Sequence, residues 1–197
     1  MSSSASSRKS HLQVLRGGRR VSADVAGIRV VVAREDDPPF GVDAVAVEDD
    51  TWLALGTPAD VVSSPGHPVR VMTRVWEAQP EEPGTVLVKR GSPLRLHAVV
   101  HDLNADPSWN EAWVRAALSG IFEEAARHRL RALRLPLLAT KHGSLPAKRF
   151  MALLREALVE HAASVQQHLQ GIWLVRDGES GADLLATLVA SEQRDDP

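Results

Sequence analysis

Three consecutive acidic residues with chemically useful side chains directly follow a predicted strand. Glu48, Asp49 and Asp50 follow the apolar segment 42–47, whose small and β-branched residues are typical of a strand. Ligands of open α/β sheets gather outside the carboxyl ends of strands, and divalent cations such as Ca²⁺ prefer oxygen ligands. The run therefore fits a cation or hydroxyl-binding site. It equally fits a solvated acidic turn that caps a helix, and we favour this second interpretation.

A second polar loop, made of Thr140, Lys141, His142 and Gly143, follows the apolar segment 133–139. The lysine can neutralise a phosphate, and the histidine can accept or donate a proton near neutral pH. An exposed loop without a function explains the same residues. Because the loop follows a strand end, it is our first candidate for a functional loop.

Two histidines, His97 and His101, share one face of the predicted strand 96–101 because strand side chains alternate with a period of two. Two imidazoles bind a metal only if a third ligand completes the site. We therefore favour hydrogen-bonded histidines within a core strand, and we predict no metal site.

Composition excludes several classes of function. The chain of 197 residues has no cysteine, which excludes disulfides, a cysteine nucleophile and thiolate metal sites. It contains neither Gly-x-Ser-x-Gly nor a phosphate-binding P-loop. A formal net charge of −2 gives no general case for nucleic-acid binding, and no apolar run reaches the length of a membrane helix. We predict a cytoplasmic protein with no cofactor, no catalytic residue and no membrane partner.

The first 20 residues differ in composition from the rest, because they are rich in serine and arginine and contain no acid. Such a composition is typical of a transit peptide or of a mobile basic tail that contacts an acidic partner or nucleic acid weakly. We favour the mobile tail. The predicted organisation is a tail over 1–26, one domain over 27–191 and a polar tail over 192–197.

Strands and helices alternate through the predicted domain. The strands are expected at 28–33, 42–47, 85–88, 96–101, 133–138 and 172–175, and the helices near 69–79, from 106–108 onward, at 147–169 and at 182–190. Several strands are apolar on both faces, which indicates a sheet with helices on both sides. The predicted fold is a three-layer α/β/α domain with a central mixed sheet.

Three stretches together resemble a macro domain. The first is Asp36 followed by Val-Asp-Ala-Val at 42–45, and the second is 84–94 with the strand end Val-Val-His at 99–101. The third is Leu-Arg-Leu-Pro-Leu-Leu-Ala-Thr at 133–140, with Pro146 opening the next helix. The resemblance covers 28–188 in element order, and it implies a macro-like fold.

The resemblance also implies a ligand site. It matches Asp36 with an adenine-recognising aspartate, although an aspartate before two prolines also suits a turn. It matches Asp50 with an asparagine that contacts ribose, and Gly56 with one glycine of a phosphate loop. The polar loop described above corresponds to a second phosphate loop. The implied ligand-binding residues are Asp36, Asp50, Gly56, Thr140, Lys141, His142 and Gly143.

The departures from the family pattern fall on these loops. Asn-Ala-Ala-Asn is replaced by Val-Glu-Asp-Asp at 47–50, and Pro58, which lacks an N–H, follows the only remaining glycine of the first loop. The Gly-Thr-Gly loop is replaced by Ala-Thr-Lys at 139–141. We therefore expect a macro-like binding domain for an ADP-ribose-related nucleotide or another phosphorylated ligand, without hydrolase activity. The alternative is a structural or protein-interaction domain that has lost nucleotide binding.

Overall fold

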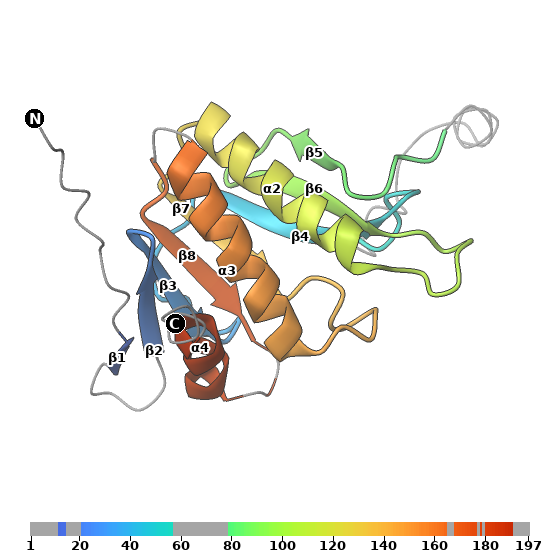
Figure 1. Ribbon diagram of the computed structural model, residues 1–197. Helices are drawn as coiled ribbons and strands as arrows, with labels where there is room; N and C mark the ends of the chain where they lie inside the picture. The colour runs from blue at the N-terminus through green and yellow to red at the C-terminus, as the bar shows by residue number, and fades with distance from the viewer. Residues whose placement is uncertain are drawn as a thin grey trace, which may run out of the picture.

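The computed structural model describes residues 12–14, 21–56, 79–164, 168–176, 178 and 180–190. In these residues, strands and helices alternate along the chain (Figure 1). The strands are β1 (Leu12–Val14), β2 (Val21–Val25), β3 (Ile28–Ala33), β4 (Ala44–Asp50), β5 (Val86–Lys89), β6 (Leu94–His101), β7 (Ala132–Pro136) and β8 (Gly171–Val175). The helices are α2 (Glu111–Arg127), α3 (Ala147–Ser164) and α4 (Gly181–Ala190).

All the described strands belong to one eight-stranded sheet with the order β1-β2-β3-β8-β7-β4-β6-β5. The five central strands pair in parallel, from β3 through β8, β7 and β4 to β6. The pairs at both edges, β1 with β2, β2 with β3 and β5 with β6, are antiparallel. The predicted α/β fold with a central mixed sheet is therefore confirmed, and the carboxyl ends of the central strands meet at one edge.

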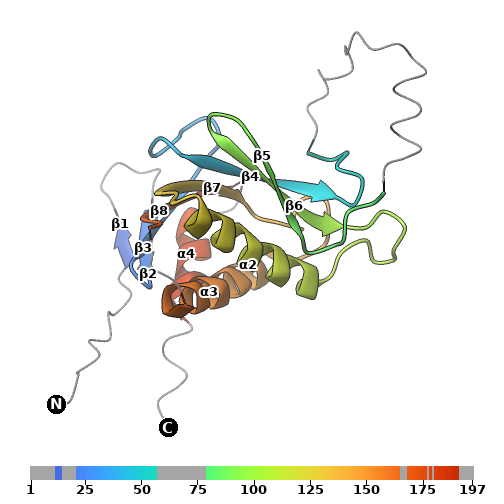
Figure 2. The same cartoon turned by 90° about the horizontal axis from the view of Figure 1, so that it is seen from above.

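The three described helices lie side by side on one face of the sheet (Figure 2). Their apolar stripes and the facing strands form the main core, whose largest fully buried side chains include Phe122, Phe150, Ile121 and Leu154. On the other face, a smaller cluster packs Ala33, Trp173 and Val175 against Phe40 and Val42, which precede β4. The helix expected near 69–79 lies outside the described residues.

Helix α2 begins later than the sequence suggested. Asn110 is its N-cap, and the Asn110 side-chain oxygen accepts a hydrogen bond of 3.0 Å from the Trp113 amide. The expected caps, Asp106 and Ser108, belong to the preceding loop, in which the Ser108 carbonyl accepts from the Asp102 amide. Asparagine caps helices as well as serine or aspartate does, so propensity could not decide between these positions.

The folded domain starts before the predicted boundary at residue 27. Strand β2 pairs with β3 along its whole length, and β1 pairs with β2. The hairpin between β2 and β3 turns at Ala26 and Gly27, which both have positive φ angles, 52° and 84°. Asn-Gly is the usual pair for such a turn. Ala-Gly is a weaker signal, which is why the hairpin was missed.

Among the described residues, no helix combines the length and the apolar character that crossing a membrane would require.

His161 of α3 makes stability depend on pH. The side chain is buried, and its ring lies 5.4 Å from that of Phe122 on α2. Burial disfavours the charged imidazolium and lowers the pKa of His161, although Glu123 partly opposes the shift. Between the lowered native pKa and the unfolded value of about 6.5, the unfolded chain binds more protons. Stability should therefore fall as the pH decreases from about 6.5 towards the native pKa.

The measurement is urea unfolding between pH 5 and pH 8. We expect the variant His161→Phe to show a flatter pH dependence than the wild type. His128→Phe, at an exposed position just after α2, measures what the loss of a surface imidazole and its contact with Glu124 does to the slope. Equal slopes for His161→Phe and the wild type would contradict the assignment.

Candidate functional site

Strand β4 continues through the three acidic residues that were expected to end it. Asp49 and Asp50 are fully buried, and the Glu48 side chain is only 9% exposed. Buried carboxylates are tolerated only where hydrogen bonds or opposite charges compensate for lost hydration. The interpretation of this run as a solvated acidic turn is therefore wrong, and each carboxylate has identifiable partners.

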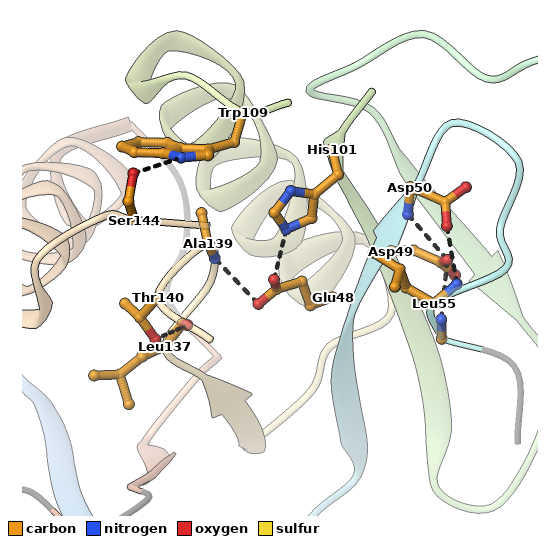
Figure 3. A network of polar contacts seen from close by, with 11 residues as sticks. Glu48, Asp49, Asp50, Leu55, His101, Trp109, Leu137, Ala139, Thr140 and Ser144 are labelled. Carbon is orange, nitrogen blue, oxygen red and sulfur yellow. Dashed lines mark hydrogen bonds and ion pairs between the residues drawn. The ribbon is translucent and has the colours of Figure 1, made fainter. Parts of the chain in front are cut away.

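The Asp50 carboxylate organises the turn that follows β4. It accepts hydrogen bonds from the amides of Trp52 at 2.6 Å, Ala54 at 3.2 Å and Leu55 at 2.9 Å (Figure 3). These three donors would otherwise be left without partners by the turn. The carboxylate is enclosed by backbone, which leaves it unsuited to the role of ribose acceptor that the resemblance implied.

Asp49 connects the same turn to β6. One carboxylate oxygen accepts from the amides of Asp50 and Gly56, both at 3.0 Å, and the other is 2.8 Å from Nδ1 of His97. A Cβ at Gly56 would lie 2.5 Å from this carboxylate and 2.7 Å from Val47 Cγ1. Gly56 is therefore required for the close approach of the turn to β4, and its amide is already used by the protein.

Glu48 joins three elements at the carboxyl edge of the sheet. One carboxylate oxygen lies 2.6 Å from Nε2 of His101 on β6, and the other accepts from the Ala139 amide at 3.1 Å (Figure 3). His97 and His101 are thus hydrogen-bonded core histidines, as the sequence interpretation favoured. The Ala139 amide, at the position of a family glycine, is not available to a ligand.

The loop after β7 folds back on itself. Ala139 has a positive φ of 58°, and its carbonyl accepts from the Leu145 amide. Trp109 covers the loop and donates from Nε1 to Ser144 Oγ at 3.2 Å. A Cβ at Gly143 would lie 2.4 Å from the Ala139 carbonyl oxygen, so only glycine fits beneath the indole. Packing therefore fixes the path of the loop.

Three successive amides of this loop are not used internally. Within the described residues, no hydrogen bond involves the backbone N–H of Lys141, His142 or Gly143. Successive N–H groups in a turn can bind an anion. The loop therefore keeps donors that a phosphate could use, although the family glycines are missing.

A cavity of about 1110 Å³ lies beside this loop. Its walls are formed by β4, by β7, by the start of β6 and by the segment that leads into α3. Among the predicted ligand-binding residues, Gly56, Thr140, Lys141 and His142 line it, and Glu48 lines it as well. The sequence thus identified the loop side of this cavity.

The described wall of the cavity carries an excess of unpaired positive charge. Both of its carboxylates have partners within the protein, because Glu35 forms an ion pair with Arg134, and Glu48 is hydrogen-bonded to His101 and to the Ala139 amide. Arg95 and Lys141 are exposed on the wall, and neither makes an ion pair with a described residue. The cavity is therefore suited to an anion.

Comparisons with known proteins place this geometry in a structural context. No protein-family profile matches the sequence, and no curated protein sequence is detectably similar to it. A mutant Oceanobacillus iheyensis macrodomain with ADP-ribose superimposes with a TM-score of 0.62 at 11% identity, over 93% of this chain and 98% of that chain. The Trypanosoma brucei macrodomain in complex with ADP-ribose superimposes with a TM-score of 0.54 at 14% identity, over 83% of this chain and 68% of that chain.

The macro domain of ganglioside induced differentiation associated protein 2 aligns with a TM-score of 0.58 at 12% identity, over 82% of this chain and 84% of that chain. The chain has a macro-like fold. These superpositions establish the fold. At such low sequence identity they carry no information about the ligand.

The macro-like domain does not bring all the predicted residues to one depression. Asp36, whose side chain is 68% exposed, pairs with Arg34 at 3.0 Å and lines a separate pocket of about 220 Å³. Asp50 is enclosed in the turn after β4, and Gly143 packs under Trp109. None of these three lines the cavity. Of the residues that the resemblance assigned to one ligand site, only Gly56 and the loop residues from Thr140 to His142 line the same cavity.

The two arginines on the cavity wall were not among the predicted ligand-binding residues. Arg95 and Arg134 each stand between apolar residues of a strand, at the positions opposite to the core. The sequence did contain a signal that could have identified them. Each is a charged residue at an alternating position of an otherwise apolar strand. It marks a face of the sheet that is open to solvent or to a ligand.

Proposed function

We propose that this macro-like domain binds a phosphorylated, nucleotide-like ligand, ADP-ribose or a related compound, in the cavity beside the loop after β7. The supporting observation is the charge of the wall. Its carboxylates are paired within the protein, while Lys141 and Arg95 have no ion-pair partner in the described structure. A phosphate placed there would meet uncompensated positive charge and the unused loop amides.

The dimensions and position of the cavity are consistent with such a ligand. Small-molecule pockets commonly enclose about 300–1,000 Å³, and this cavity, at about 1110 Å³, has room for a nucleotide. It is bordered by Pro146 and Ala147 at the start of α3, where the helix dipole favours negative charge. Its loop side also lies at the carboxyl ends of β4 and β7, where ligands of α/β sheets usually bind.

The proposal assigns no hydrolytic role to the domain. Both oxygens of the Glu48 carboxylate already have partners, and Asp49 and Asp50 are enclosed. A general base must reach the group that it deprotonates. The carboxylates of the acidic run are held by the protein itself and are not presented to the cavity as bases.

Replacing Lys141 tests the proposed site. We expect Lys141→Ala to weaken the binding of ADP-ribose about tenfold, because one charge-assisted hydrogen bond contributes about 1.5 kcal/mol or more. Arg129→Ala removes an equivalent exposed charge from the turn after α2, away from the cavity wall, and should leave the affinity unchanged. The measurement is calorimetric titration at low ionic strength, with ADP-ribose and ADP as ligands.

Two results would count against the proposal. If neither ADP-ribose nor ADP binds at millimolar concentration, the alternative of a structural or protein-interaction domain is favoured. If ADP-ribose binds but Lys141→Ala and Arg129→Ala weaken binding equally, the ligand occupies some other part of the surface.

A further inference from the structure

We infer that Arg95 and Arg134 form a second anion-binding subsite in the cavity, so that its ligand carries two separated anionic groups. The inference rests on the proposed function and adds to it, because the first anionic group would contact the loop that contains Lys141. It follows from the strand register, from the environment of the two arginines and from the distance along β4 between the arginine row and the loop.

The register places the two arginines in one row across the sheet. Val45 of β4 pairs with Arg95 of β6 on one side and with Arg134 of β7 on the other. Arg134 pairs in turn with Trp173 of β8. Side chains that are directly paired in neighbouring strands point to the same face. Leu96 follows Arg95, and Leu133 precedes Arg134. Both leucines belong to the core and point to the helix-covered face of the sheet.

The spacing of the row allows both arginines to reach one group. Neighbouring strands lie about 4.8 Å apart, so the Cα atoms of Arg95 and Arg134 are roughly 10 Å apart across β4. Between them stands only the short side chain of Val45, and all three residues line the cavity. Two arginine side chains can converge above a valine on one phosphate or carboxylate, which the planar guanidinium binds through paired N–H donors.

Arg134 is held on the β8 side of the row, away from Arg95. Its guanidinium lies 5.3 Å from the ring centroid of Trp173 and forms an ion pair with Glu35, whose side chain is 68% exposed. The Nε atom of Arg134 is buried and has no hydrogen-bond partner. Arg95 is exposed and makes no ion pair with a described residue. Among the described residues, the row therefore contains two cations, of which one is in an ion pair, and only one carboxylate contacts them.

The two subsites meet β4 at different positions. The arginine row crosses β4 at Val45, whereas Ala139, two residues before Lys141, donates to Glu48, three residues further along the strand. Three residues of a strand span about 10 Å. A diphosphate alone is too short to occupy both subsites. A compound with phosphates at both ends of a sugar, or a nucleotide with a second distant phosphate or carboxylate, has the required separation.

Matched sugar phosphates test the inference. Fructose 6-phosphate carries one phosphate, and fructose 1,6-bisphosphate carries a second one at the far end of the same sugar. We expect the bisphosphate to bind at least about tenfold more tightly in calorimetric titrations at low ionic strength. Arg95→Ala should abolish this preference while leaving the affinity for fructose 6-phosphate within about twofold. Arg129→Ala, in the turn after α2, serves as the control and should change neither affinity.

A gain of affinity provides an independent readout. Glu35→Gln removes the carboxylate that competes for Arg134, so we expect it to strengthen binding of the bisphosphate severalfold. Loss of folding cannot produce this result. Equal affinities for the two sugar phosphates, or a preference that survives Arg95→Ala, would overturn the second subsite. If ADP-ribose binding still depends on Lys141 in that case, the proposed function stands without it.

Discussion

Asp50→Ala is expected to lower the free energy of unfolding by about 3–5 kcal/mol, the largest effect of any single substitution considered for this protein. The carboxylate is fully buried, and it accepts three backbone amides of the turn after β4. Hydrogen bonds to charged groups contribute about 1.5–3 kcal/mol each. Alanine would leave the amides of Trp52, Ala54 and Leu55 without an acceptor, and water entering the cavity would restore only part of the loss.

The measurement is equilibrium unfolding in urea. Asp36→Ala is the matched control, because it removes an exposed carboxylate with a surface ion pair and should change stability by no more than about 0.5 kcal/mol. Asp50→Asn retains one acceptor oxygen and should be intermediate, which keeps the test informative if the alanine variant does not fold. A wild-type midpoint for Asp50→Ala would show that the turn does not depend on this carboxylate.

ADP-ribose is expected to bind this domain about two to four decades more weakly than it binds a macro domain with intact glycine loops. At two positions where the macro domain pattern has a phosphate-loop glycine, the backbone amide already donates a hydrogen bond within this protein. Gly56 donates to Asp49, and Ala139 donates to Glu48. If each unmade hydrogen bond to a charged phosphate oxygen costs about 1.5–3 kcal/mol, their loss accounts for this range. Lys141 and the unused amides of its loop offset part of the loss.

The same reasoning predicts no appreciable release of ADP-ribose from an ADP-ribosylated protein. Calorimetric titration with and without Mg²⁺, together with a hydrolysis assay, measures both expectations, and an intact macro domain studied in parallel provides the reference. Micromolar affinity or clear turnover would show that the altered loops still support the family chemistry. The proposed weak binding and the absence of hydrolysis would then both have to be abandoned.

The sequence by itself determined the order and type of most elements. The apolar, β-branched runs that became β3, β6 and β8 were recognised because strands buried on both faces leave an uninterrupted hydrophobic signal. The start of α3 at Ala147 was predicted from Pro146, since proline is favoured at helix starts. The macro-like fold was expected from the resemblance of three sequence stretches, and the structure confirms it. Strand β2 was missed, because its Ala-Gly turn is a weak local signal and its pairing with β3 depends on tertiary structure.

Only the tertiary structure decided what the polar residues do. Glu48, Asp49 and Asp50 read locally as a solvated run, yet their partners come from β6, from the turn after β4 and from the loop after β7. The arginines of β6 and β7 are separated along the chain and become neighbours only through the register of β4. Hydrogen bonds and charge pairs act over a few ångströms in space, and proximity of this kind is set by strand pairing and is not encoded in local sequence spacing.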